Sequence, residues 1–156
     1  MNQTETAGSA NTAGEIAMAH GAIATKLGLK SGDLNVGLHV AKGLLDRGSF
    51  GEALRTYTAL VLCEPTNAEF QIGLSNCALV MGEDSLCLHA ASAVVALAPT
   101  DPRGYFLSGR ACLALGQWVE AEEDFRDALA HAKQARNALI AGQAEKLLAH
   151  ISALKH

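Results

Sequence analysis

The chain of 156 residues has the length of one domain, and its 49% apolar against 18% charged residues predict a folded core and exclude wholesale disorder. The 12 basic and 16 acidic residues give a net charge of −4 at pH 7 without a Lys/Arg cluster, which disfavours nucleic acid and anionic membranes as partners. Because no stretch of about 18 consecutive apolar residues occurs, direct membrane insertion is not expected.

The N-terminal part of the chain separates into two segments. Residues 1–13 are small and polar and lack the basic start and apolar stretch of a signal peptide, so we expect them to be disordered and the protein to be cytoplasmic. Residues 14–33 are expected to form an N-terminal helix and a linker from Gly28 to Asp33. The helix would carry one apolar face, made of Ile16, Ala19, Ile23 and Leu27.

A period of 34 residues runs through the middle of the chain. Gly48, Gly82 and Gly116 keep this spacing, and so do Pro65 and Pro99. The period, with its recurring glycine, small, aromatic and proline positions, resembles the tetratricopeptide repeat, in which each unit is a pair of antiparallel helices. Each glycine lies where a first helix must end in a left-handed turn, a conformation that glycine adopts without steric cost.

The period predicts an all-α fold of three helical hairpins over residues 34–135. The units are 34–67, 68–101 and 102–135, and their helix pairs are 34–47 with 50–63, 68–81 with 84–97, and 102–115 with 118–132.

Local signals support the predicted helix starts. Ser49 and Thr66 each have a glutamate three residues later, which is capping-box spacing, and Asp101 precedes Pro102 as an N-cap precedes the first helical residue.

Residues 136–156 are predicted to form an amphipathic helix that caps the repeats. Because the third unit has Lys133 where the others have proline, its second helix is expected to run directly into this capping helix.

The sequence contains no motif that predicts chemistry. Its six histidines are scattered without HExxH or zinc-ligand spacing, and its glycines form no phosphate-binding loop. The four cysteines lie in apolar helical patterns without a CxxC pair, which predicts buried, reduced thiols. Trp118 is expected in the core of its unit. We therefore expect no catalytic residue, cofactor or metal, and a protein that is not an enzyme.

Stacked hairpins of this kind curl into a superhelix whose concave face is lined by the first helix of each unit and suits a peptide. Three positions of each first helix are therefore predicted to line a peptide-binding groove in which apolar residues surround one basic or polar residue per unit. These positions are Leu38, Lys42, Leu45, Ile72, Asn76, Leu79, Phe106, Arg110 and Leu113. The alternative is that several of the leucines only pack the core.

The second and third units resemble a particular repeat family. The second unit contains Phe70-x-x-Gly73-Leu74-x-x-Cys77-x-x-x-Met81-Gly82, and the third contains Pro102-Arg103-x-x-Phe106 and Gly116-x-x-x-Glu120-Ala121-Glu122. These segments are similar to those of the class II translocator chaperones of bacterial type III secretion, the LcrH/SycD-type family. The order of an N-terminal helical region, three repeats and a C-terminal helix resembles that family too.

The resemblance implies a cytoplasmic chaperone that binds hydrophobic translocator proteins in its groove and keeps them soluble and apart before secretion. It also implies a homodimer, with residues 14–33 as the candidate dimerisation segment. In the first unit the chain departs from the family, because Leu38, Lys42 and Leu45 stand where aromatic residues are usual.

Two alternatives stay open. One is a generic tetratricopeptide scaffold or co-chaperone that holds a peptide segment of another partner. Its best-known form, a clamp for a C-terminal carboxylate, is disfavoured because Leu38, Gly73 and Leu107 occupy three of the clamp positions. The other is a chaperone for a needle subunit of the same secretion apparatus.

Overall fold

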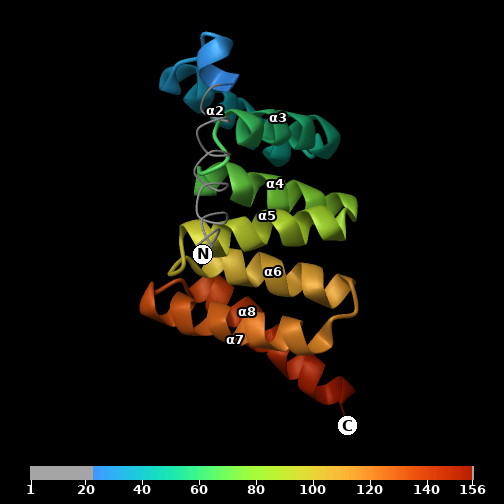
Figure 1. Ribbon diagram of the computed structural model, residues 1–156. Helices are drawn as coiled ribbons and strands as arrows, with labels where there is room; N and C mark the ends of the chain where they lie inside the picture. The colour runs from blue at the N-terminus through green and yellow to red at the C-terminus, as the bar shows by residue number, and fades with distance from the viewer. Residues whose placement is uncertain (1–22, 156) are drawn as a thin grey trace, which may run out of the picture.

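The computed structural model describes residues 23–155 as a stack of helical hairpins (Figure 1). The helices are α2 (Ser31–Asp46), α3 (Phe50–Cys63), α4 (Ala68–Met81), α5 (Asp84–Leu97), α6 (Pro102–Ala114), α7 (Trp118–Gln134) and α8 (Ala138–Leu154). The predicted all-α fold of three hairpins followed by a C-terminal helix is confirmed. The segment expected to be disordered, 1–13, lies outside the described residues, and of the expected N-terminal helix only 23–26 is described, as helix.

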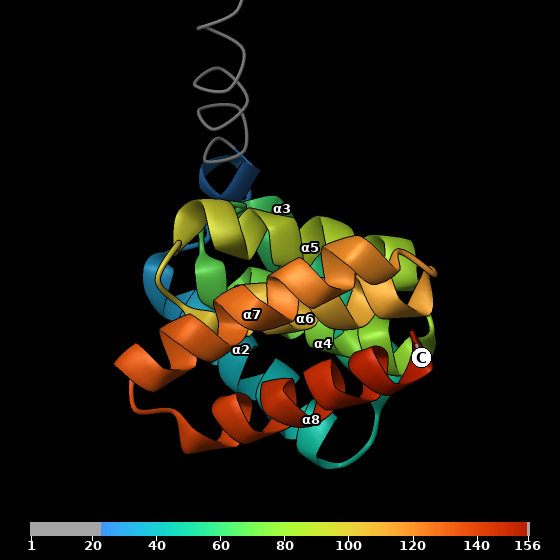
Figure 2. The ribbon, with the colours of Figure 1, turned by 90° about the horizontal axis from the view of Figure 1, so that it is seen from below.

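The helices form two layers. Figure 2 shows α3, α5 and α7 on one side, and α2, α4 and α6 with α8 on the other. We call these the second-helix face and the first-helix face. Helix α8 packs against α7 and α6, as α4 packs against α3 and α2. The C-terminal helix therefore occupies the place of the first helix of a fourth unit.

The predicted left-handed glycine turns are confirmed. Gly48, Gly82 and Gly116 have φ values of 76°, 75° and 76°. After each of them, the next residue donates its N–H to the carbonyl five residues earlier, over 2.8 to 2.9 Å. These hydrogen bonds end each first helix, and they turn the chain into the second helix at the same point of every unit.

The predicted caps are confirmed at one site out of three. The Asp101 carboxylate accepts a hydrogen bond from the Arg103 N–H over 2.9 Å, with Pro102 in the first turn. The Ser49 side chain makes no cap hydrogen bond. Helix α4 is capped by Asn67, one residue after the predicted Thr66, because the Asn67 side chain reaches the free N–H groups of the first turn. Helix α2 also begins three residues before the predicted boundary.

The predicted continuation of the third unit into the C-terminal helix is wrong. Helix α7 ends at Gln134, and Arg136 takes a left-handed conformation with φ 55°. The N–H of Asn137 bonds to the carbonyl of Ala132 over 2.8 Å, and the Asn137 side chain accepts from the N–H of Ile140. Arg136 thus stands in the turn position that glycine occupies at the ends of α2 and α4.

This turn yields a stability prediction. Arg136→Gly is expected to raise the free energy of unfolding by about 0.5–1 kcal/mol, because the left-handed conformation costs a residue with a Cβ about that much. Urea denaturation measures it. The converse change at a glycine turn, Gly82→Ala, should lower stability by about 1 kcal/mol, and a loss of stability in Arg136→Gly would contradict the explanation.

At two places in the core, an aromatic ring of a second helix lies directly against a glycine of a first helix. Tyr57 of α3 is 2% exposed and its ring occupies the space beside Gly73 of α4, while Phe125 of α7 is fully buried beside Gly109 of α6. Burial raises the pKa of Tyr57 to about 12, with smaller contributions from neighbouring acidic groups. The four cysteines are buried free thiols, as predicted.

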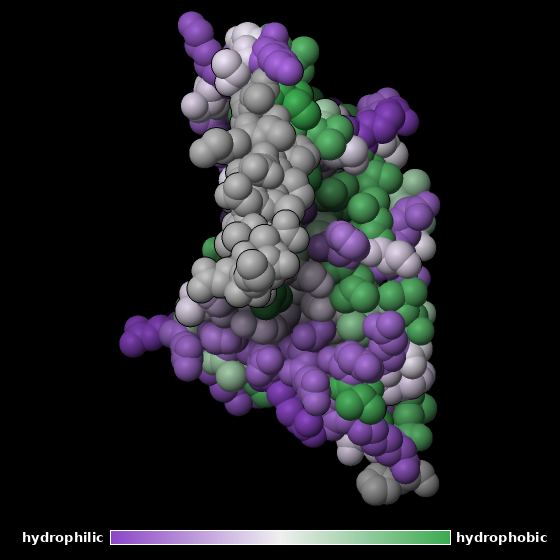
Figure 3. Space-filling model, viewed as in Figure 1, coloured by the Kyte–Doolittle hydropathy of each residue, from purple (hydrophilic) through white to green (hydrophobic). Residues whose placement is uncertain are grey.

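The expected burial of Trp118 is wrong. Trp118 begins α7 at the edge of the stack and is 44% exposed, beside Val119 at 62%. Figure 3 shows hydrophobic side chains gathered along this edge, where the turns within the second and third hairpins lie. The ring borders a hollow of about 380 Å³ together with Ile151, Leu154 and Lys155 of the C-terminal helix region. The core position of the unit is taken by Phe125 instead.

Candidate first-helix groove

All nine predicted groove residues lie on the first helices, in three layers. The polar member of each layer is exposed to solvent, and these are Lys42, Asn76 and Arg110. The apolar members are partly buried except for Ile72, which is 6% exposed; the partly buried ones are Leu38, Leu45, Leu79, Phe106 and Leu113. A row of solvated polar groups therefore crosses the repeat between apolar side chains.

The apolar members also stabilise the fold. Leu38 and Leu45 pack against the core that the first two hairpins share. Leu79 packs between α5 and α6 residues, and Phe106 and Leu113 pack against α7 and α8. The alternative role of core packing therefore applies to part of each of these side chains. Lys42, Asn76 and Arg110 do not belong to the core clusters of the described residues.

A hollow of about 200 Å³ opens on the first-helix face between α4, α6 and α8. It contains three of the predicted groove residues, Ile72, Asn76 and Phe106. The residues that complete its wall are Arg103, Leu107, Ile140 and Gln143. Its lining combines four apolar side chains with two amides and one guanidinium. The hollow suits an apolar side chain whose neighbouring main-chain groups meet the amides. The predicted residues of the first unit, on α2, do not line it.

Sequence reasoning missed the contribution of the C-terminal helix to this hollow. Ile72, Phe106 and Ile140 are separated by the same 34 residues that separate the glycines. The period therefore continues into α8, and this spacing was the signal that could have identified Ile140. The continuation of the period was overlooked because α8 lacks the turn residues that mark the end of a first helix in the other units.

An ion-pair cluster borders the hollow on one side. The Arg103 guanidinium donates to Asp101 over 2.7 to 3.1 Å and to Glu69 of the preceding unit over 2.6 Å. The hydrogen bonds that Arg103 donates to Asp101 are the largest cause of the raised pKa of Arg103. Burial raises the pKa of Asp101, but the hydrogen bonds from Arg103 outweigh it and hold that pKa below its usual range. The cluster joins the second and third units.

The lowered pKa of Asp101 predicts a pH dependence. A depressed carboxylate pKa stabilises the fold above the unfolded value of about 3.9, and this stabilisation is lost as the pH falls through the folded value. Asp101→Asn keeps a cap acceptor but removes the charge, so it should cost about 0.5–1 kcal/mol at pH 7. Chemical denaturation at several pH values should show this difference shrinking below about pH 4, and a difference that grows on acidification would contradict it.

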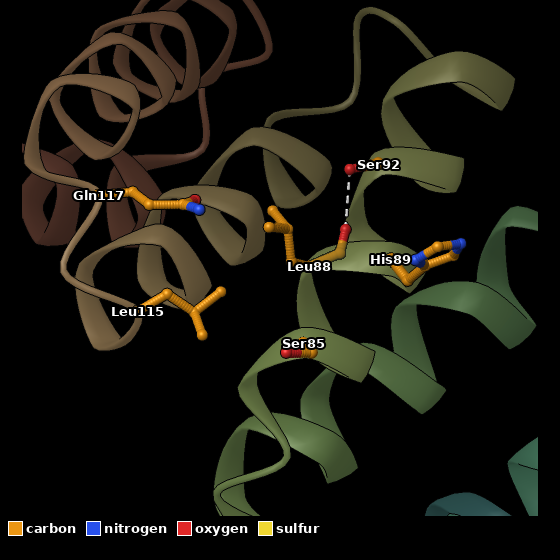
Figure 4. A pocket seen from close by; sticks show the side chains of 6 residues that line it. All are labelled: Ser85, Leu88, His89, Ser92, Leu115 and Gln117. Carbon is orange, nitrogen blue, oxygen red and sulfur yellow. Dashed lines mark hydrogen bonds between the residues drawn. The ribbon is translucent and has the colours of Figure 1, made fainter.

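A second hollow, of about 500 Å³, lies on the second-helix face against α5. Figure 4 shows Leu88 directed toward Leu115 and Gln117, while the His89 ring is turned away from them. The Ser92 hydroxyl donates to the Leu88 carbonyl over 2.8 Å. Within the described residues no hydrogen bond joins His89 to Ser85 or Ser92, so this hollow shows no paired nucleophile and base.

No group of three or more His, Cys, Asp or Glu side chains in residues 23–155 is arranged to hold a metal ion. No helix in the same range has the length and apolar character needed to cross a membrane.

Solved structures share this architecture. The structure of PcrH, from Pseudomonas aeruginosa, with the chaperone-binding region of PopD is 25% identical, covers 83% of this chain and 98% of its own, and has a TM-score of 0.78. SycD from Yersinia enterocolitica with a peptide of the translocator YopD is 23% identical, covers 81% and 98%, and has a TM-score of 0.76. The first tetratricopeptide repeat domain of Spaghetti (RPAP3), bound to the HSP90 peptide SRMEEVD, is 22% identical, covers 81% and 97%, and has a TM-score of 0.72.

No family model matches the sequence, and no curated protein matches it significantly. PcrH and SycD recur among the structural matches, with TM-scores from 0.73 to 0.78. The chain therefore has the fold of the class II translocator chaperones, and the predicted resemblance to the LcrH/SycD-type family is supported by structure.

Proposed function

We propose that this protein is a cytoplasmic, non-enzymatic chaperone of a type III secretion system that binds hydrophobic translocator proteins and keeps them soluble and apart before secretion. The observation that carries the proposal is the hollow between α4, α6 and α8, in a chain that has the fold of PcrH in complex with the chaperone-binding region of PopD and is 25% identical to PcrH over 83% of this chain. An apolar segment held on this face would be withdrawn from water and from other apolar chains.

The arrangement of the first-helix face supports peptide binding. Exposed Asn76 and Gln143 have no hydrogen-bond partner within residues 23–155, so their amides are available to the main chain of a bound segment. In the same lining, Ile72 and Ile140 are buried and Phe106 is partly buried, and these three supply an apolar surface. Amides beside an apolar surface can hold an extended chain while one of its side chains is buried.

We also propose a homodimer formed through residues 14–33. The described end of this segment carries apolar side chains in solvent: Leu27 is 66% exposed and Ile23 38%. Val36 and Val40 on the adjoining helix α2 are 65% and 49% exposed. Covering these side chains with a second copy would remove them from water. Light scattering of the full chain and of a chain lacking residues 1–33 tests this. We expect a dimer for the full chain and a monomer for the shortened one, and the same oligomeric state for both chains would contradict the proposal.

Co-expression tests the chaperone activity. Each translocator of the same secretion system is expressed alone and together with this protein, and the soluble fraction and the co-purified complex are measured. We expect at least one translocator to be soluble only in the presence of this protein. Equal solubility of every translocator without it would contradict the proposal. A complex formed without any gain in solubility would favour the scaffold alternative.

A further inference from the structure

The hollow on the first-helix face is flanked by two arginines on the same helix. Arg103 lies three residues before Phe106 and Arg110 four residues after it, so the two lie about one helical turn to either side of the ring. Within residues 23–155, one of them pairs with carboxylates and the other has no ion-pair partner. This difference determines where a bound segment can place a charge.

Arg103 is occupied. Its guanidinium nitrogens donate to both carboxylate oxygens of Asp101 and to both of Glu69. A further carboxylate approaching Arg103 would meet two negative charges at hydrogen-bond distance from the same group. The Arg103 side of the hollow therefore repels an acidic side chain.

Arg110 is available. It is exposed, and no carboxylate in residues 23–155 lies within ion-pair distance of it. Its guanidinium carbon lies 6.0 Å from the centre of the Phe106 ring, and this cation–π contact holds it beside the ring that walls the hollow. An arginine held in this way loses little conformational freedom when it binds a carboxylate through two hydrogen bonds.

Lys42 adds a second positive charge to the first-helix face. It occupies the position equivalent to Arg110 in the first unit, it is exposed, and it too has no ion-pair partner among the residues described. The exposed polar row is therefore cationic at both ends and neutral at Asn76 in the middle, although the chain as a whole carries a net charge of −4.

We propose that Arg110 is a specificity-determining residue that selects client segments carrying an aspartate or glutamate next to the apolar side chain that enters the hollow. This inference rests on the proposed function. One helical turn along α6 is about 5.4 Å, and an extended chain advances about 3.3 Å per residue. The carboxylate is therefore expected within about two residues of the apolar anchor.

Overlapping synthetic peptides that tile the translocators of the same secretion system provide the probe. Their affinity for the full chain is measured by fluorescence anisotropy with wild type, Arg110→Gln and Arg55→Gln. The Arg55 variant is the matched control, because Arg55 is an exposed arginine on α3 without an ion-pair partner among residues 23–155. The tightest peptide is then remade with each Asp or Glu replaced by its amide.

We expect Arg110→Gln to weaken the tightest peptide about tenfold, as the loss of a charge-assisted hydrogen bond does, and Arg55→Gln to leave it unchanged. One amide replacement in the peptide should cause the same loss with wild type and no further loss with Arg110→Gln. The affinity of wild type should also fall more steeply with salt than that of Arg110→Gln.

The two proposals fail in different ways. If no translocator peptide binds wild type, the proposed function is contradicted. If a peptide binds wild type but binds Arg110→Gln equally well, or if the tightest peptide contains no carboxylate, the role of Arg110 is overturned and the proposed function stands.

Discussion

Gly73→Ala is expected to destabilise the protein by about 3 kcal/mol or more, at or beyond the upper end of ordinary overpacking changes. A Cβ at residue 73 would lie 1.9 to 2.4 Å from three ring carbons of Tyr57. The ring is 2% exposed and packed in the core of the first two hairpins, so it cannot move aside without displacing its neighbours. Thermal and urea denaturation measure the loss.

Two other glycines give a graded control. At Gly109 a Cβ would lie 2.8 Å from the Phe125 ring, so Gly109→Ala should cost about 1–2 kcal/mol. At Gly142, in the second turn of α8, nothing lies within 4 Å, and Gly142→Ala should stabilise the helix by about 0.5–1 kcal/mol. A Gly73→Ala protein as stable as Gly142→Ala would contradict the contact between α3 and α4.

Asn76→Trp is expected to lower the affinity for a translocator segment at least tenfold, equivalent to about 1.4 kcal/mol. Asn76 is exposed at the rim of the hollow between α4, α6 and α8, so a tryptophan there can fill the space a client side chain would occupy. The fold should be little affected, since surface changes away from special features usually stay within about 0.5 kcal/mol. Calorimetric titration gives the affinity, and circular dichroism checks the fold.

The matched control places the same side chain in the other hollow. Ser85 is exposed and lines the hollow beside α5 on the second-helix face (Figure 4). Ser85→Trp should therefore leave the affinity for the translocator unchanged. If Ser85→Trp abolishes binding while Asn76→Trp does not, the client lies on the second-helix face and the assignment of the groove is wrong.

The repeat could be predicted because its signals are backbone requirements that recur. Glycine at 48, 82 and 116 is favoured by a left-handed turn, and the structure has φ near 75° at each of them. The end of α7 could not be predicted in the same way, because Arg136 adopts that conformation without being a glycine. Its turn depends on the hydrogen bond from Asn137 to Ala132 and on the packing of α8, which are tertiary features.

The sequence could predict which residues lie on the first helices but not which of their side chains form ion pairs. The position in the repeat predicted that Lys42, Asn76 and Arg110 lie among apolar residues of the first helices, and the structure exposes all three to solvent. It could not distinguish Arg103, which pairs with Glu69 of another unit, from Arg110, which has no ion-pair partner within residues 23–155, because ion pairs across units depend on side-chain geometry. The role of the nine residues in binding a client stays a prediction.

Hydrogen exchange of the complex with a full-length translocator tests the central claim most directly. Amide exchange is compared between the free protein and the complex that forms on co-expression. A client held by the first-helix face should slow exchange in α4, α6 and α8, around Ile72, Phe106 and Ile140, and leave α3 and α5 unchanged. Protection confined to α3, α5 and α7, with none in α4, α6 or α8, would contradict it.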